Sequence, residues 1–241
     1  MAAPFTPHLD ILPREQRELW PLLGASSTLG FVLYGGTAIA LRQGHRPSVD
    51  FDFFSESPLD KDALRATFSF IGNAPVLQDQ LDTFTALVSP GFSSTTSGES
   101  QGDSDLGEQH EVKISFFGGL GFGRIGEPEV AVPGSVQVAS LNDLLAHKLK
   151  VILQRIEAKD YLDIATLISA GVQLDIGLAG ARTMFGPNFQ PSECLKALVY
   201  FEGGDLDSLP DQTRATLIEG VRNVGSLPAV PRLSAKLASN T

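Results

Sequence analysis

The strongest constraint on the fold lies in one short stretch, YGGTAIALRQGHRPSVDFDFF, which begins at Tyr34. The apolar run at residues 31–34 stops at two glycines, as a buried strand does at a tight turn. Thr37 can cap the following segment, which has helix formers for about two turns. Residues 49–54 alternate with a period of two, which is typical of a strand. The stretch therefore predicts a strand, a glycine turn, a short helix and a second strand.

The rest of the chain continues this mixed pattern and then becomes helical. In the first part we expect helices at 13–23 and 59–70, strands at 76–80, 84–88 and 110–117, and a break at 128–133. Ser140 and Asp143 form a capping-box-like start to a helical pattern that runs to residue 160. More helices are expected near 159–170, 174–185, 192–201 and 212–224. We predict the α+β class, with a mixed sheet and flanking helices in residues 1–135 and a helical part in 136–241.

The segment at residues 89–110 is rich in Gly, Ser and acidic residues and has no periodicity. It is longer than ordinary hairpin loops, and such composition is typical of disorder. We interpret it as a mobile insertion. A lid over a functional site is the alternative.

The composition indicates a globular protein outside the membrane. Hydrophobic residues make up 42% and charged residues 19%, and the apolar stretches at 31–41 and 144–156 are interrupted by polar residues or glycine. Neither approaches the roughly 20 apolar residues that span a bilayer. The first residues lack a signal-peptide pattern, and the single Cys194 suits a reducing cytoplasm and a structural role. The net charge of −10 argues against a broad surface for nucleic acid and leaves the partner open.

The alternating strand carries two carboxylates, Asp50 and Asp52, on one face. Their Cα atoms are expected roughly 6–7 Å apart, and such a pair is costly unless a cation lies between them. Magnesium ions that clamp reacting oxygens in phosphoryl transfer are a common solution. A solvated strand edge is the alternative.

The glycine turn offers a second element of a site. Gly35, Gly36 and Thr37 begin a helix, so their backbone N–H groups could bind a phosphate. Arg42 and Arg46, at the end of that helix and in the next loop, could neutralise phosphate by forked hydrogen bonds. His45 is a further candidate phosphate contact. A purely structural turn remains the alternative, so the weight comes from the combination of the two elements.

Together these residues resemble the first motif of the nucleotidyltransferase superfamily, in particular its abortive-infection, AbiEii-type toxin branch. That branch has Gly-Gly-Thr, a short helix and Arg-x-Ser-x-Asp-x-Asp, and this chain has Arg-Pro-Ser-Val-Asp-Phe-Asp at 46–52. A later motif of the branch is similar to Lys148, Arg155 and the sequence Lys-Asp-Tyr-Leu-Asp at 159–163. The resemblance covers about residues 30–170 and implies a nucleotidyltransferase-like sheet with a helical part that completes the site.

The resemblance also implies roles for individual residues. Asp50 and Asp52 would be catalytic and bind Mg²⁺, with two ions expected, and Lys148 and Asp160 would complete the catalytic set. The nucleotide-binding residues would be Gly35, Gly36, Thr37, Arg42, Arg46, Ser48 and Arg155. Independently, the spacing of Lys148, Arg155 and Lys159 predicts one face of a helix. A solvated basic face is the alternative reading, and His147 is expected at the surface.

The chain departs from the family pattern at Ser115. Nucleotidyltransferases of this kind carry a third carboxylate on a later strand, and Ser115 stands where that acid is expected. Glu111 shares the same strand face but lies about 13 Å away along the strand. Asp79 and Asp82 on neighbouring strands are the remaining candidates for its task.

The sequence therefore predicts a Mg²⁺-dependent nucleotidyltransferase that moves a nucleotide from an NTP to a hydroxyl of a macromolecule, either tRNA or a protein. The resemblance implies a toxin with a separate antitoxin protein as partner. Two alternatives remain open. One is a nucleotide-binding module of the same fold without turnover, and the other is a structural or interaction protein.

Overall fold

The computed structural model describes residues 2–89 and 111–239. Nearly all of the segment interpreted as a mobile insertion therefore lies outside the described residues. The described chain forms one mixed sheet of eight strands in the order β1-β7-β8-β2-β3-β6-β5-β4. The strands are β1 (Pro4–Phe5), β2 (Val32–Tyr34), β3 (Asp50–Phe54), β4 (Val76–Gln80), β5 (Thr83–Val88), β6 (Val112–Phe117), β7 (Glu129–Ala131) and β8 (Val136–Val138).

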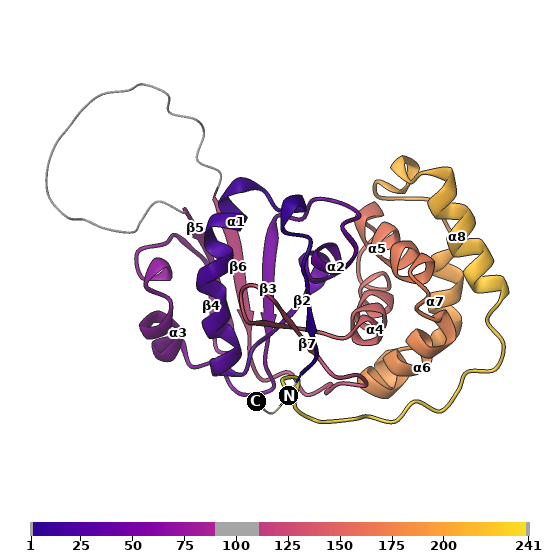
Figure 1. Ribbon diagram of the computed structural model, residues 1–241. Helices are drawn as coiled ribbons and strands as arrows, with labels where there is room; N and C mark the ends of the chain where they lie inside the picture. Colours follow the sequence, from indigo (N-terminus) through magenta and orange to yellow (C-terminus); the bar gives the residue numbers. More distant parts are fainter. Residues whose placement is uncertain (1, 90–110, 240–241) are drawn as a thin grey trace, which may run out of the picture.

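Eight α-helices accompany this sheet in the described residues (Figure 1). They are α1 (Arg14–Leu19), α2 (Gly35–Gln43), α3 (Lys61–Thr67), α4 (Leu141–Val151), α5 (Ala158–Ser169), α6 (Leu174–Phe185), α7 (Pro191–Leu198) and α8 (Asp211–Arg222). Helices α4 to α8 gather beside the sheet, on the side of α2 (Figure 1). The expected α+β class, with a mixed sheet and a helical second half, is confirmed.

Strand β3 lies at the centre of the sheet and separates core from site. Phe51 and Phe53 are fully buried, and Phe53 stacks on Phe116 of β6 with ring centroids 5.3 Å apart. Because successive side chains of a strand point to opposite faces, Asp50 and Asp52 project from the other face. The hydrophobic packing of the phenylalanines therefore fixes the direction of both carboxylates.

The first expected helix and the expected break both differ in the structure. The helix predicted at 13–23 ends at Leu19 and continues as a 3₁₀ helix, Trp20–Leu29, because Pro21 has no N–H to donate within an α-helix. The segment at 128–133 is not a break, since β7 pairs there with β1 and β8. Its prolines flank the strand, where a missing donor is tolerated.

The helical pattern from 140 to 160 forms two helices. Ser140 caps α4, and its side chain accepts a hydrogen bond from the Asp143 N–H, as predicted. However, α4 ends at Val151 and α5 begins only at Ala158. The Ala158 N–H donates to Asp205 Oδ1 at 2.6 Å, so the second start is stabilised by a residue 47 positions away.

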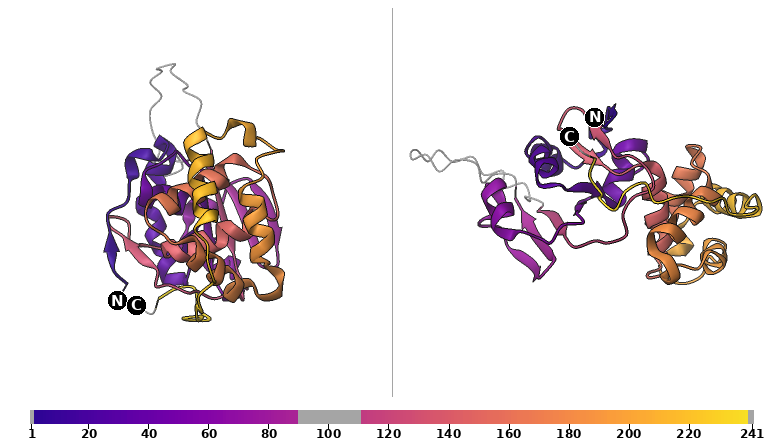
Figure 2. Two further views of the ribbon diagram at one scale, coloured as in Figure 1. Left: turned by 90° about the vertical axis from the view of Figure 1, so that its right-hand side faces the viewer. Right: turned by 90° about the horizontal axis from the view of Figure 1, so that it is seen from below.

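The two predicted parts are joined at more than one point. Strand β8 extends the sheet beyond residue 135, since Val138 pairs with Leu33 of β2. After α8 the chain runs back to the sheet (Figure 2), where Arg124 Nη1 donates to the carbonyls of Lys236 and Ala238 at 2.8 and 2.9 Å. The described ends of the chain consequently lie close together. A division into two domains at 135/136 stays a prediction.

Candidate active site

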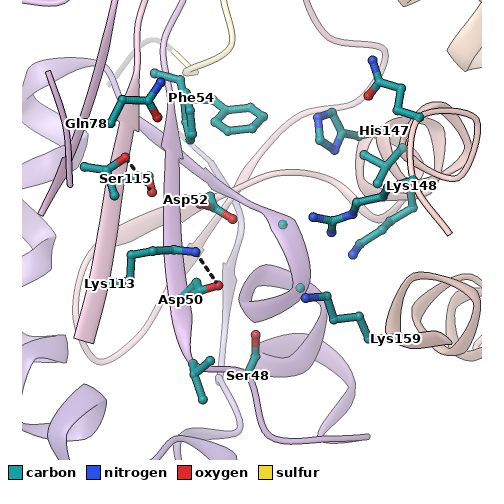
Figure 3. Close-up of a pocket in the computed structure, with 18 of the residues that line it drawn as sticks. Ser48, Asp50, Asp52, Phe54, Gln78, Lys113, Ser115, His147, Lys148 and Lys159 are labelled. Carbon is teal, nitrogen blue, oxygen red and sulfur yellow. Dashed lines mark hydrogen bonds and ion pairs between the residues drawn. The ribbon is translucent and has the colours of Figure 1, made fainter. Parts of the chain in front are cut away.

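A cavity of about 630 Å³ opens between the strand face that carries the carboxylates and the helices α4 and α5 (Figure 3). It gathers residues far apart in the sequence. The strand side contributes Asp50, Asp52, Phe54, Gln78, Thr85, Lys113, Ser115 and Phe117, and the helical side contributes His147, Lys148, Val151, Gln154, Arg155 and Lys159. The remaining lining residues are Gly35, Gly36, Arg46, Pro47, Ser48, Val49 and Leu77.

The glycine turn lies against the charged side chains of this cavity. Gly35 has φ +76°, a left-handed conformation that favours glycine, and it begins α2 directly after β2. A Cβ on Gly35 would lie 2.7 Å from Asp52 Oδ2, and one on Gly36 would lie 2.5 Å from Arg46 Nη2. No side chain caps the N-terminus of α2, so its N–H groups remain available to an anion.

Thr37 follows the two glycines in the first turn of α2 but does not line the cavity. It is buried, and its hydroxyl lies 2.8 Å from Ser48 Oγ and within hydrogen-bonding distance of the Asp50 carbonyl. Ser48 itself lines the cavity. The Thr37 hydroxyl therefore ties the start of α2 to the start of β3, and a direct contact with phosphate is not what its position offers.

Asp50 and Asp52 both face the cavity but differ in their surroundings. Lys113 Nζ lies 3.0 Å from Asp50 Oδ2 (Figure 3). Asp52 is more enclosed, and among the described residues no lysine or arginine forms an ion pair with it. Burial and the nearby Asp50 charge raise the pKa of Asp52 above its ordinary value, while the more distant Lys113 and Lys148 lower it only in part. An additional cation at this carboxylate pair would relieve the cost.

The predicted alignment of Ser115 with the carboxylates holds in the register of the sheet. β3 and β6 are parallel, and Asp52 pairs with Ser115. Ser115 pairs with Thr85 of β5, and Thr85 pairs with Gln78 of β4. Thr85 Oγ1 donates to Ser115 Oγ at 3.3 Å. The row beside Asp52 is thus polar and uncharged. Within residues 2–89 and 111–239, no three His, Cys, Asp or Glu side chains come together as a metal site.

Neither proposed replacement for the third acid lies at the cavity. Asp79 forms ion pairs with Lys61 and Arg65 on the exposed edge of the sheet. Asp82 accepts a hydrogen bond from the Leu59 N–H at 3.1 Å and so holds a loop. The sequence could not exclude them, because both lie near β5 and their direction depends on pairing between distant strands.

Buried carboxylates hold the lysine of the helical wall. Lys148 Nζ lies 2.5 Å from Asp160 Oδ1 and 2.7 Å from Asp163 Oδ2, and both aspartates are fully buried. Burial alone would raise the pKa of each, but hydrogen bonds and neighbouring cations outweigh it and hold both pKa values below the ordinary range. Asp160 therefore lies behind Lys148 and does not line the cavity.

Asp163 also holds the loop that precedes β3. Arg46 Nε and Nη2 each lie 2.7 Å from one oxygen of Asp163, a forked geometry, and His45 Nε2 lies 2.7 Å from Oδ1. One carboxylate of α5 therefore positions Arg46, His45 and Lys148 together. The sequence analysis included Asp163 in the later family motif but assigned no role to this residue. The signal was present, since Asp160 and Asp163 are three apart on one helix face.

The three basic residues at 148, 155 and 159 do not share one helix face. Arg155 lies in the connection between α4 and α5, where its Nε donates to Asp160 Oδ2 at 2.8 Å. Lys159 lies on α5, and its Nζ is 2.8 Å from Glu157 Oε2. The expectation from seven- and four-residue spacing was therefore wrong in its geometry, although Lys148, Arg155 and Lys159 do meet at the cavity.

Arg42 lies away from the cavity. Its guanidinium pairs with Glu129 at 2.9 Å, donates to the carbonyls of Val138 and Ala139, and lies over the Phe5 ring. This buried position joins α2 to the edge of the sheet. A phosphate contact by Arg42 is not supported, because Arg42 does not line the cavity and its Nη1 and Nη2 donate to β7 and the end of β8.

His147 is not the surface residue that the sequence suggested. Its ring contacts Phe54 and Tyr34 with centroids 5.3 and 5.7 Å apart, and Phe122 and Phe185 complete the enclosure. The side chain keeps some exposure to the cavity. Burial, with a smaller contribution from Lys148, lowers the pKa of His147 to about 4, so the imidazole is neutral near pH 7.

Comparison with known proteins identifies the family of this chain. The model of the family described as "Nucleotidyl transferase AbiEii toxin, Type IV TA system" matches residues 22–223. An uncharacterized protein of Aquifex aeolicus (strain VF5), aq_aa25, is 28% identical over 195 residues, which cover 79% of this chain and 84% of that protein. In the part of the chain that the structure describes, no helix is long and apolar enough to cross a membrane. The chain belongs to the AbiEii family of nucleotidyl transferase toxins of type IV toxin–antitoxin systems.

Proposed function

We propose that the protein is a Mg²⁺-dependent nucleotidyltransferase that moves a nucleotide from an NTP to a hydroxyl of a macromolecular acceptor. One observation carries this proposal. Asp50 and Asp52 face the uncapped N-terminus of α2 and the side chains of Lys148 and Arg155 across a single cavity. Carboxylates for a cation and donors for an anion are what the transfer of a phosphoryl-linked group requires.

The triphosphate has a defined place in this arrangement. The N–H groups at Gly35 and Gly36 make no hydrogen bond to a capping side chain, and the missing Cβ atoms leave room beside Asp52 and Arg46. Arg46, Lys148 and Arg155 supply positive charge, and the buried aspartates behind them keep that charge at the cavity wall. Such fixed donors stabilise developing negative charge without reorganisation during the reaction.

The carboxylate pair fits a divalent cation. Oxygen ligands suit Mg²⁺, and burial together with the neighbouring Asp50 charge raises the pKa of Asp52, a cost that a bound cation would offset. When bound, Mg²⁺ would neutralise triphosphate charge and polarise the reacting phosphate. We propose two ions, as in the general two-metal arrangement, with Asp50 and Asp52 as their protein ligands. Lys113 would then release Asp50 or share it with the cation.

The nucleotide-binding module without turnover is the second candidate, and Ser115 favours it. The position beside Asp52 carries a hydroxyl, and the neighbouring Thr85 and Gln78 add no charge. A serine hydroxyl is too weak an acid to stay ionised, so Ser115 cannot take over the task of a carboxylate base. If the protein is an enzyme, transfer without this base would depend on the cation and on the positioning of the two substrates.

The family membership extends the proposal to the cellular role. We propose that the transfer acts in the cytoplasm as a toxin activity, that an antitoxin protein is the partner, and that the acceptor is tRNA or a protein. Fixed cations around a small cavity suit one NTP and one acceptor terminus.

Transfer of label from α-³²P-labelled NTPs tests the proposal directly. The wild type is incubated with total RNA or a protein extract, with Mg²⁺ or with chelator, beside Asp52→Asn and the exposed control Asp62→Asn. We expect labelled product only with Mg²⁺, and equal product from wild type and the control. Saturable NTP binding without product would favour the module without turnover. No binding by any variant would contradict both candidates.

A further inference from the structure

The cavity changes character along its strand side. β3 presents Asp50, Asp52 and Phe54 in order, and the parallel β6 presents Lys113, Ser115 and Phe117 in the same register. Charge therefore gives way to aromatic surface in the same direction on both strands. With a rise of about 3.3 Å per residue, the aromatic pair lies roughly 7 Å beyond Asp52. Phe54 and Phe117 meet edge to face, with centroids 5.2 Å apart, and both line the cavity.

His147 faces this aromatic end from the helical side (Figure 3). Its ring lies 5.3 Å from the Phe54 ring, and no hydrogen bond to another described residue contributes to its pKa. Its ring nitrogens are not among the buried polar atoms that lack a hydrogen-bond partner, and His147 lines the cavity. The nitrogens are therefore open to the cavity. A neutral imidazole offers one hydrogen-bond donor and one acceptor. Such a group among aromatic rings suits a ligand with a flat apolar face and polar edges.

We infer that the end of the cavity formed by Phe54, Phe117 and His147 binds the nucleobase of the NTP, with His147 contacting a polar edge of the base. This inference rests on the proposed function, because it starts from a triphosphate at the opposite, charged end. A phosphate gains little beside uncharged rings, whereas a base stacks on aromatic side chains. His147 would therefore contribute to the choice among NTPs.

Inorganic tripolyphosphate separates the two ends of the cavity, because it carries the charge of an NTP but no base. The Kd values of tripolyphosphate and of each of the four NTPs are measured with Mg²⁺ for the wild type and four variants, of which Gln78→Ala shortens a polar side chain on the other strands of the cavity. His147→Phe keeps the packing of the ring and removes its polar atoms. Phe117→Leu keeps apolar volume and removes the flat face. Phe185→Leu is the matched control, since Phe185 packs on His147 but does not line the cavity.

We expect Phe117→Leu to weaken NTP binding by roughly 5- to 150-fold, the range for loss of one base–aromatic stack. His147→Phe should weaken the preferred NTP by about tenfold and bring the four NTPs closer together in affinity. Tripolyphosphate binding should not change in either variant. Phe185→Leu should lower the melting temperature without changing the ratio of NTP to tripolyphosphate affinity.

Three outcomes would overturn the inference, and each leaves a different part of the function standing. Equal loss for NTP and tripolyphosphate in His147→Phe would mean a general effect on the site. Loss of NTP affinity in Gln78→Ala, with none in Phe117→Leu, would place the base along the polar row of β4 and β5. Unchanged NTP affinities in both aromatic variants would remove the base from this end. If the wild type binds neither ligand, the proposed function itself fails.

Discussion

Asp163 offers the sharpest test of how the cavity is built. Its carboxylate is fully buried and contacts Arg46 through two nitrogens, Lys148 through Nζ and His45 through Nε2, each at 2.7 Å. Asp163→Asn preserves the size of the side chain and removes the charge. Arg46 would lose its carboxylate, and Lys148 would retain only Asp160. Two cations would then be undercompensated in a buried environment.

The expected magnitude follows from these contacts. Removing one partner of a buried ion pair costs about 3–5 kcal/mol of the free energy of unfolding. For a domain of this size, 1 kcal/mol changes the melting temperature by about 2–4 °C. Asp163→Asn should therefore melt roughly 6–20 °C below the wild type at pH 7. Circular dichroism melts measure this. Asp62→Asn is the control, because the Asp62 side chain is fully exposed and its one ion pair, with Arg65 at 3.9 Å, is a loose surface contact.

A double-variant cycle distinguishes the network from a general packing defect. Lys148→Met removes one of the cations that Asp163 compensates, so the cost of Asp163→Asn should be smaller in that background. We expect a coupling of about 0.5–3 kcal/mol, the range for residues within one ion-pair network. A melting temperature of Asp163→Asn equal to that of Asp62→Asn would refute the reasoning. So would strict additivity with Lys148→Met.

Three further predictions concern the charges around the cavity. Asp52→Asn should abolish transfer yet melt at or above the wild type without Mg²⁺, and the gain should shrink as pH falls through the raised pKa of Asp52; a lower melting temperature at pH 7 would contradict this. Ser115→Asp should lower the melting temperature without Mg²⁺ and gain more from Mg²⁺ than the wild type does, and equal Mg²⁺ shifts would mean that residue 115 does not face the cation. Burial lowers the pKa of His147 from 6.5 to about 4. As pH drops from 6.5 to 4, the wild type should therefore lose up to about 3 kcal/mol of its free energy of unfolding relative to His147→Phe. Lys148 adds to this loss and Asp160 opposes it, and parallel pH profiles of the two proteins would contradict the assignment.

Local patterns in the sequence were sufficient for the strand–turn–helix–strand unit. The period of two at residues 49–54 determined which side chains share a face, and the phenylalanines on the other face are buried as that period requires. The Ser140 cap was equally local, because its partner Asp143 is three residues away. The family motif then allowed Ser115 to be aligned with the carboxylates, and the register of β3 and β6 agrees.

The rest of the site depends on contacts that no local pattern encodes. The start of α5 depends on Asp205. The sequence suggested that Arg42 is free to bind phosphate, but its guanidinium donates hydrogen bonds to Glu129 and to two distant carbonyls. His147 reads as a polar helix residue, and only the packing of β2, β3 and α6 makes its surroundings aromatic. Each of these three errors arose where an element packs against one that is distant in the chain.

The buried aspartates also explain how an acidic protein presents a basic cavity. The chain has a net charge of −10, which argues against a broad cationic surface. Asp160 and Asp163 lie behind Lys148, Arg155 and Arg46, so these cations are fixed at the cavity wall while their counter-charges are hidden from a ligand. Positive charge is thus concentrated where a triphosphate would bind, in a chain whose overall charge is negative. An RNA acceptor would therefore be recognised through its terminus at the cavity, with few phosphate contacts elsewhere.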